Sequence, residues 1–243
     1  MRVLTVALAV VFITGVVHAD ILFDFGEFVS GCDPLEEWGY VTRSPDPYQS
    51  RHWNNIWGMD WDPPDPNEVF AFNNLIDTAG VGTGVNLAVS GFTVDGYRGI
   101  PGDGLYPETA QIDAIGVRCA DANNPIGRGI VTVSGLTEPL YTIKLFSSTH
   151  EDVEWYNDDT RRTQFTIGTD TRIVHCSGNT SYIETYWDIA AVDGTITVQV
   201  TGATPGGEET YSYGYLNVME IVVPEPATLG LLALGAAAMI RRQ

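Results

Sequence analysis

Apolar and polar side chains alternate with a period of two through the middle of the chain. Ile196, Val198 and Val200 are separated by threonine and glutamine, and Phe165 and Ile167 repeat the pattern. Such alternation is typical of a β-strand with one buried face. No stretch sustains the 3.6-residue period of an amphipathic helix. Short strands bounded by turn residues therefore predict an all-β fold, an antiparallel β-sandwich.

The strands are expected at the apolar runs between turn residues. In the first run, Ile21, Phe23 and Phe25 are predicted to face inward. Residues 27–69 contain many prolines and tryptophans instead, and they are predicted to be irregular. The predicted strands are Ile21–Gly26, Phe70–Asp77, Gly84–Ser90, Gln111–Val117, Gly129–Ser134, Leu140–Ser148, Thr163–Gly168, Thr171–Cys176, Tyr182–Ile189, Thr195–Thr201 and Tyr211–Val222.

The N-terminal end departs from the alternating pattern. Arg2 precedes an apolar run over 3–17, and small residues stand three positions and one position before a cut after Ala19. These features predict a signal peptide over residues 1–19, which signal peptidase would remove. The alternative interpretation is an N-terminal anchor or a buried helix.

The C-terminal residues 223–243 form the second exception. Pro224, Glu225 and Pro226 come first, and the prolines keep this segment extended and accessible because they cannot donate backbone hydrogen bonds. An apolar run over 227–240 follows and is predicted to be a short helix. At ~1.5 Å per residue it reaches roughly 21 Å, so it spans a ~30 Å hydrocarbon core poorly.

Two arginines, Arg241 and Arg242, complete the sequence. They fit the positive-inside rule and are expected to stay cytoplasmic. The membrane is therefore expected to be a transient partner, contacted only through this segment. The alternative is a C-terminal core helix with a basic end.

The chain is strongly acidic, with 31 Asp and Glu against 12 Lys and Arg and a net charge of −19. Three of the arginines lie in the terminal segments, so residues 20–222 are more acidic still. Nucleic acid and anionic lipid are poor partners for such a surface, whereas neutral sugars, cations or basic surfaces fit it better. The charge is also explained if it only keeps an exported protein soluble.

Three cysteines, Cys32, Cys119 and Cys176, are widely spaced and match no zinc-binding pattern. In an oxidising compartment one disulfide and one free thiol are reasonable. The sequence leaves open which two would pair, and whether any do.

An acidic cluster between residues 60 and 68 offers hard oxygen ligands at short spacing. Asp60, Asp62 and Asp65 are its aspartates, and carboxylates of this kind suit a structural Ca²⁺ ion. The prolines between them exclude an EF-hand loop. The alternative is an acidic surface loop stiffened by proline, and no other cofactor is indicated.

Aromatic residues in polar loops are candidates for stacking against sugar rings. Trp155, Tyr156 and Asn157 place two aromatic rings and an amide between two predicted strands, and they form the candidate ligand site. Trp53, Trp57 and Trp61 form another cluster, which is predicted to cover one end of the sandwich core.

Enzyme signatures are mostly absent. The chain has no G-x-S-x-G, no H-E-x-x-H and no P-loop. His150 to Asp152 places an imidazole beside two carboxylates, but such a run is more often a solvated loop. The paired carboxylates of glycosidases are close in space rather than in sequence, so that catalytic class stays open and no catalytic residue is assigned.

The C-terminal segment closely resembles the PEP-CTERM sorting signal of Gram-negative bacteria, in its Pro224-Glu225-Pro226 motif, its apolar helix and its arginine pair. The resemblance implies recognition by a membrane-embedded exosortase, export through an inner-membrane intermediate and an association with exopolysaccharide production. It divides the chain into a signal peptide (1–19), a passenger domain (20–222) and a sorting segment (223–243).

Seven short motifs follow one another in the passenger: WNNI (53–56), LIDTAGVGTGVNL (75–87), VSGL (133–136), YTIKLFSS (141–148), RTQFTIG (162–168), DGTITVQV (193–200) and YLNVMEI (215–221). Together they resemble the jelly-roll, galactose-binding-like modules of secreted bacterial proteins. That family implies a β-sandwich, often sugar-binding and often with a structural calcium. The expected function is an exported cell-surface or extracellular-matrix protein whose noncatalytic sandwich binds carbohydrate. The alternatives are a purely structural matrix component and a polysaccharide hydrolase or lyase.

Overall fold

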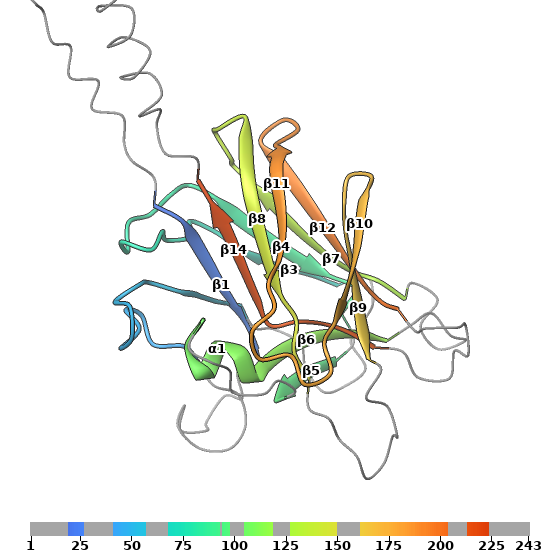
Figure 1. Ribbon diagram of the computed structural model, residues 1–243. Coiled ribbons are helices and arrows are strands. Elements are labelled where there is room, and N and C mark those ends of the chain that lie inside the picture. The colour runs from blue at the N-terminus through green and yellow to red at the C-terminus, as the bar shows by residue number, and fades with distance from the viewer. Residues whose placement is uncertain are drawn as a thin grey trace, which may run out of the picture. The chain divides into compact units, whose positions relative to one another are not determined.

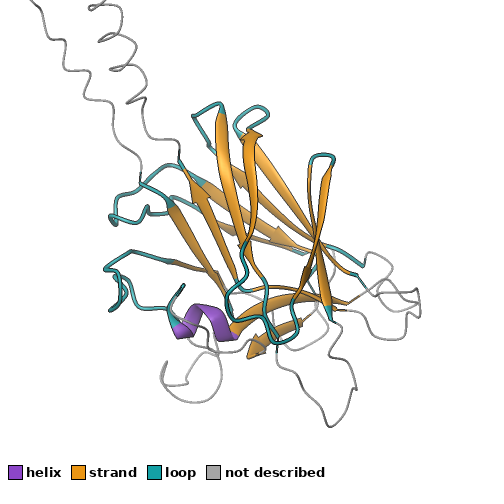
Figure 2. Ribbon diagram, viewed as in Figure 1, coloured by secondary structure: helices purple, strands orange, loops and turns teal. Residues whose placement is uncertain are grey.

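The computed structural model describes residues 19–26, 41–56, 68–92, 94–97, 105–118, 127–149, 161–203 and 213–223. Two large sheets enclose a common apolar core, and a smaller third sheet lies at one end of them (Figure 1). Nearly all of the described regular structure is strand, with one short helix (Figure 2). The predicted all-β sandwich is confirmed.

The described residues form fourteen strands and one short helix. They are β1 (Ile21–Phe25), β2 (Asn54–Ile56), β3 (Val69–Phe72), β4 (Asn86–Ser90), β5 (Val94–Tyr97), α1 (Glu108–Ile112), β6 (Asp113–Arg118), β7 (Gly129–Ser134), β8 (Leu140–Phe146), β9 (Arg162–Ile167), β10 (Asp170–His175), β11 (Glu184–Ala190), β12 (Thr195–Gly202), β13 (Tyr213–Leu216) and β14 (Val218–Val222).

The sheets have five, six and three strands. Their strand orders are β11-β8-β14-β1-β2, β10-β9-β12-β7-β4-β3 and β13-β6-β5. From β7 onward the chain passes repeatedly between the two large sheets, as in a jelly roll. Strand pairing is antiparallel except between β1 and β2, which run parallel, so the purely antiparallel prediction misses this pair.

The six-stranded sheet follows the predicted alternation. Ile196, Val198 and Val200 on β12 are buried, and the residues between them are half-buried or exposed. Phe165 and Ile167 on β9 also face the core. One face of this sheet therefore builds the core and the other faces solvent, as the period-two pattern predicts.

The first strand of the five-stranded sheet is buried on both faces. Ile21, Phe23 and Phe25 lie in the main core, as predicted. Leu22 and Asp24 point to the opposite face, and they are buried as well. Leu22 belongs to a second apolar cluster with Trp53, Tyr106, Ala110, Phe146 and Val218. The period-two pattern identified the inward face correctly but did not reveal that the outer face is covered.

Two predicted strands are wrong in part. The segment Gln111–Val117 begins within α1, a helix too short to show a 3.6-residue period, and only continues as β6. The segment Tyr211–Val222 is divided at Asn217 into β13 and β14, which belong to different sheets. Asn217 fixes this change of sheet because its side chain accepts a hydrogen bond from the Ser148 amide (2.7 Å) and donates one to the Gln111 carbonyl (2.8 Å).

Two short strands were not predicted. The three-residue β2 lies in the stretch expected to be irregular, where it pairs with β1. The four-residue β5 contains a glycine and pairs with β6. Strands of this length carry too few alternating positions to be recognised without their partners.

The two ends of the described domain are neighbours. Strand β1 pairs with β14, with Ile21 opposite Ile221, and the Val223 amide donates a hydrogen bond to the Asp20 carboxylate (3.2 Å). Residues from Ala19 to Pro224 form one compact unit. Most of the predicted signal peptide and sorting segment, including the apolar run over 227–240, lies outside the described residues.

Within the described part of the chain, no helix has the length and apolarity needed to cross a membrane.

One cysteine can be placed. Cys176 is buried as a free thiol, and its burial raises the pKa of that thiol. Cys32 and Cys119 lie outside the described residues. The predicted combination of one disulfide and one free thiol therefore stays a prediction.

Candidate functional site

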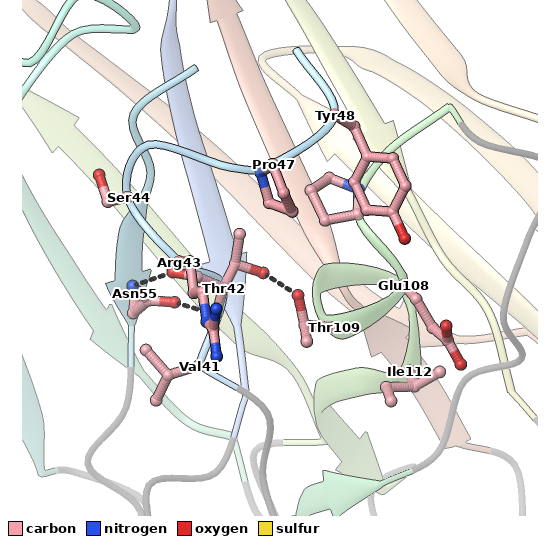
Figure 3. A pocket seen from close by; sticks show the side chains of 11 residues that line it. Val41, Thr42, Arg43, Ser44, Pro47, Tyr48, Asn55, Glu108, Thr109 and Ile112 are labelled. Atoms are coloured by element: carbon pink, nitrogen blue, oxygen red, sulfur yellow. Dashed lines mark hydrogen bonds between the residues drawn. The ribbon is translucent and has the colours of Figure 1, made fainter. Parts of the chain in front are cut away.

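A cavity of about 600 Å³ opens beside the outer face of the five-stranded sheet. One wall is the segment 41–48, and the other is the start of α1 (Figure 3). These walls are far apart in sequence and meet only because both pack near β1 and β2. The lining residues are Val41, Thr42, Arg43, Ser44, Pro47, Tyr48, Asn55, Pro107, Glu108, Thr109 and Ile112.

Asp46 fixes the loop that carries Pro47 and Tyr48. Its carboxylate is buried and accepts hydrogen bonds from the amides of Tyr48 (2.9 Å) and Gln49 (2.6 Å). The indole of Trp53 donates a further one (3.0 Å). Burial alone would raise the pKa of Asp46, but these bonds outweigh it and hold the pKa below its usual value. The loop is therefore anchored as a charged, fully bonded turn.

An aromatic stack holds the same loop against the sheet. Trp53 is only 2% exposed and meets Tyr106 edge to face at 5.9 Å between ring centroids. Tyr106 in turn contacts Phe146 of β8 at 6.0 Å. The guanidinium of Arg51 lies over the rings of Trp53 (5.6 Å) and Tyr106 (5.9 Å), within cation–π range. Trp53 was predicted to cover one end of the sandwich core, but it is buried in the second apolar cluster, on the outer face of the five-stranded sheet.

Thr42 joins the two walls at the base of the cavity. Its amide donates to the carboxylate of Asp24 (3.1 Å) and to the side-chain oxygen of Asn55 (2.9 Å). The Asn55 amide donates back to the Thr42 carbonyl (3.1 Å). Across the cavity, the hydroxyls of Thr42 and Thr109 share a hydrogen bond of 2.7 Å (Figure 3). One residue thus connects the loop to β1, β2 and α1.

Asp24 is a fully buried carboxyl beneath this wall. Desolvation raises the pKa of Asp24 to about 7, and the hydrogen bonds from Thr42 offset only part of that rise. The second carboxyl oxygen, Oδ1, has no hydrogen-bond partner among the described residues. Asp24 therefore titrates near neutral pH, directly behind the cavity wall.

Three of the exposed residues that line the cavity carry long polar or aromatic side chains. Tyr48 is 73% exposed, Glu108 is exposed on the same side of the cavity, and Arg43 is exposed on the other side, beside Thr42 (Figure 3). Among the described residues none of these side chains has a hydrogen-bond or ion-pair partner. The cavity thus offers an aromatic ring, a guanidinium donor and a carboxylate acceptor, which together suit a polyhydroxylated ligand.

None of the candidate site residues proposed from the sequence is among the described residues. The ligand candidates Trp155, Tyr156 and Asn157 lie outside the described residues. The same holds for the calcium candidates Asp60, Asp62 and Asp65 and for the sorting residues Pro224, Glu225, Pro226, Arg241 and Arg242. In the part that the structure does describe, no group of three or more His, Cys, Asp or Glu side chains could hold a metal ion.

Sequence reasoning missed the cavity itself. Its first wall belongs to the sequence VTRSPDPYQ (41–49), where proline, aspartate and an aromatic residue stand together. Aspartate followed by proline is a turn signal. A tyrosine directly after that turn could have suggested an exposed ring. Nothing in the sequence, however, indicated that Glu108 and Thr109 would lie opposite it.

Comparison with known families shows that the protein carries an export-related sorting signal. A model described as the PEP-CTERM protein-sorting motif matches residues 222–243. The chain ends in a PEP-CTERM sorting motif. It is therefore an exported protein that is processed at the membrane of a Gram-negative bacterium, as the C-terminal resemblance implied. The motif covers only the tail and says nothing of what residues 20–222 bind.

Comparison with solved structures gives three partial likenesses. The crystal structure of the plant receptor-like kinase FER has a TM-score of 0.45 at 12% identity, over 86% of this chain and 43% of that one. TmCBM61, solved with β-1,4-galactotriose, has a TM-score of 0.27 at 11% identity, over 46% of this chain and 72% of that one. The CBM36-1 domain of a multidomain xylanase from the hindgut metagenome of Trinervitermes trinervoides has 0.27 at 16%, over 45% and 97%.

None of the curated proteins compared with this chain matches it in sequence. The chain spans less than half of the plant receptor's length. What the three solved proteins bind is a property of those proteins.

Proposed function

We propose that the passenger domain of this exported protein binds carbohydrate in the cavity between segment 41–48 and α1, at the cell surface or in the extracellular matrix. The observation that carries the proposal is Tyr48, whose ring is 73% exposed although its loop is fixed by Asp46. A large aromatic side chain gains little from folding when it is held in water. An exposed, preorganised ring is useful when a sugar face stacks against it.

The remaining lining residues supply the polar contacts that a sugar needs. Arg43 carries donors, Glu108 carries acceptors, and Ser44 adds a hydroxyl, all on the cavity wall. Sugar hydroxyls both donate and accept hydrogen bonds, so a mixed lining suits them better than a wall of one charge. The acidic surface of the chain also favours a neutral ligand over an anionic one.

Binding without catalysis fits the lining better than hydrolysis. Glu108 is the single carboxylate among the described residues that line the cavity. Glycosidases commonly use two carboxyl groups about 5 to 10 Å apart. Asp24, although it titrates near neutral pH, is fully buried and does not line the cavity. We therefore propose a noncatalytic binding module.

A glycan array probed with the secreted protein tests this function. We expect Tyr48→Ala to weaken binding at least tenfold, whereas Tyr48→Phe keeps most of it because the ring does the stacking. Gln49→Ala is the matched control, because Gln49 is an exposed neighbour on the same loop and does not line the cavity. If Tyr48→Ala binds as the wild type does, the cavity is not the site. If no glycan binds at all, a structural matrix component becomes the better interpretation.

Two processing partners are part of the proposal. Signal peptidase is expected to remove residues 1–19, and an exosortase to cut near Pro224. The intact mass of the secreted protein checks both cuts, and a mature form still ending at Gln243 would contradict the second. Replacing Glu225 and both flanking prolines should retain the protein at the inner membrane.

Two proposals from the sequence remain alongside the cavity. Trp155, Tyr156 and Asn157 are proposed as a further sugar contact, and Trp155→Ala should then weaken glycan binding with little loss of stability. Asp60, Asp62 and Asp65 are proposed as ligands of a structural Ca²⁺ ion. A chelator-dependent fall in the melting temperature, absent from the triple Asn variant, would support that ion.

A further inference from the structure

The most exposed tryptophan of the described residues stands on an edge strand. Trp187 lies on β11, the outermost strand of the five-stranded sheet, and is 66% exposed. Its neighbour Tyr186 points the other way, into the core, and donates a hydrogen bond to the Phe165 carbonyl (2.8 Å). Since successive side chains on a strand alternate, Trp187 projects from the outer face of the sheet.

The strand beneath Trp187 is firmly held. Arg172 of β10 forms an ion pair with Glu184 of β11 (2.9 Å), also donates to the Thr185 carbonyl, and lies over the Tyr186 ring at 4.2 Å. The backbone residues just before Trp187 are therefore tied both to β8 and to the second sheet. The exposure of Trp187 is a property of a fixed strand and does not come from a frayed edge.

A bulge changes the strand at this point. The pairing of β11 with β8 shifts register between Tyr186 and Ile189, and Asp188 adopts a positive φ of 54°. Non-glycine residues rarely adopt this conformation, and bulges of this kind commonly redirect a side chain near a functional surface. The register shift and the positive φ thus lie directly beside Trp187, although an edge strand can pair with its neighbour without either feature.

Polar groups continue from Trp187 across the same face. Thr185 stands opposite Lys144 of β8, and Lys144 stands opposite Glu220 of β14. Lys144 and Glu220 form an ion pair of 3.1 Å, and the Tyr106 hydroxyl lies 3.3 Å from the other Glu220 oxygen. Glu220 is only 6% exposed, so the accessible part of this row ends at Lys144, one strand spacing of about 4.8 Å from Thr185.

We propose that this outer face, from Trp187 across Thr185 to Lys144, is a second carbohydrate-binding surface that takes an uncharged sugar chain. The indole ring stacks against the apolar face of one sugar unit. The ammonium of Lys144, whose side chain is 31% exposed, and the threonine hydroxyl contact the hydroxyls of the units beside it. The surface is distinct from the cavity, because none of these residues lines it.

The net charge of the protein determines which kind of polysaccharide this surface can bind. The lysine is already paired with Glu220, so the row carries no excess positive charge, and the protein as a whole carries −19. The negative charge of the protein would repel a polyanionic glycan, whereas it does not repel a neutral polysaccharide. An open sheet face suits the middle of a polysaccharide, and the cavity suits a shorter segment.

Lys144 is the single lysine of the sequence, which allows a direct test. The secreted protein is reacted with an amine-specific acylating reagent, with and without soluble neutral oligosaccharides of three to six hexose or pentose units, and the acylated peptides are identified by mass spectrometry. We expect a sugar that binds to slow acylation of Lys144 at least fivefold. The N-terminal amine is the internal control and should react at the same rate. Unchanged Lys144 reactivity with every sugar would overturn the proposal.

Variants separate this surface from the cavity. Trp187→Ala should weaken binding to a neutral polysaccharide at least tenfold, with a melting temperature within about 2 °C of the wild type. Val192→Ala, which removes another exposed apolar side chain just beyond β11, is the matched control and should bind normally. If Tyr48→Ala abolishes all binding and Trp187→Ala none, this inference fails and the cavity stands. If the reverse is found, the cavity proposal fails instead.

A protein partner would give a different result. If Trp187→Ala changes the molar mass in light scattering from a dimer to a monomer and leaves sugar binding intact, the surface is an interface between copies of this chain, and the carbohydrate proposal is overturned.

Discussion

The two large sheets of this domain use their outer faces differently. On β12 of the six-stranded sheet, Ile196, Val198 and Val200 are buried while the alternate residues meet solvent. On β1 of the five-stranded sheet all five residues are buried, because the segment 41–56 and α1 lie against its outer face. The six-stranded sheet has one solvent-exposed face and one buried face. The five-stranded sheet has a second layer added to it, and the cavity lies within that layer.

The added layer brings polar groups into the interior, and each needs a partner there. Thr42 hydrogen-bonds both Asp24 and Asn55, although Asp24 Oδ1 has no partner among the described residues, and Asn217 joins Ser148 to the helix. On β12 of the six-stranded sheet the alternate polar side chains remain half-buried or exposed and need no such network. A covered sheet face therefore provides what a binding site requires, namely polar groups in fixed positions beside a hollow.

The largest expected effect is loss of the anchor that holds the layer in place. Trp53→Ala removes a buried ring that contacts Tyr106 and leaves the Asp46 carboxylate without its indole donor. We expect the free energy of unfolding to fall by about 3–5 kcal/mol, the usual cost of a large core truncation. Urea unfolding followed by circular dichroism measures it.

The control for Trp53 is Trp187→Ala, which removes an equally large but exposed ring from the same sheet. Its free energy of unfolding should change by less than about 0.5 kcal/mol. Equal losses in the free energy of unfolding of the two variants would show that the layer over β1 stabilises the protein no more than an exposed surface does. The outer faces of the two sheets would then not differ in their contribution to stability.

A smaller effect is expected from the buried acid beneath the layer. Because the folded-state pKa of Asp24 is raised to about 7 from about 3.9 in the unfolded chain, the folded protein binds an extra proton between these values. Its contribution to stability is therefore greatest below pH 4 and declines as the pH rises to 7. Asp24→Asn has no such proton, so relative to the wild type it should gain roughly 2–4 kcal/mol between pH 4 and pH 8.

Unfolding of both proteins in urea at a series of pH values isolates this term, since all other carboxyl groups are common to the two. A stability difference that does not change with pH would mean that Asp24 is not protonated in the folded protein. Asp46 is a useful contrast, because the pKa of its carboxyl is lowered and its stabilising contribution is instead lost on acidification.

The same contrast explains what the sequence could predict. Strand β7 has the predicted bounds Gly129–Ser134, because its alternating side chains report directly on a wet and a dry face. The burial of Asp24 could not be read in this way, since the cover comes from residues 42 and 55, which belong to a stretch without periodicity. A strand pattern reports the faces of a strand but not the loops that fold back over it.

The candidate sites could not be predicted from the sequence for the same reason. The cavity joins Tyr48 to Glu108 across sixty residues of sequence, and the hydrogen bond between Thr42 and Thr109 links the two segments that carry them (Figure 3). Trp187 was predicted to lie in a strand, but its exposure depends on a bulge and on the position of β11 at the sheet edge. The tail could be recognised at once, because its signal is contiguous and needs no fold.

The smallest effect is expected on the open face of the six-stranded sheet. Ile173 lies on the edge strand β10 opposite Gln164 and is 53% exposed, so its side chain contributes little buried area. Ile173→Thr keeps the β-branched shape that suits a strand and should change the free energy of unfolding by less than about 0.5 kcal/mol, measured in the same urea series. A loss above about 2 kcal/mol would show that this face, too, is covered. The difference between the two sheets would then be one of degree only.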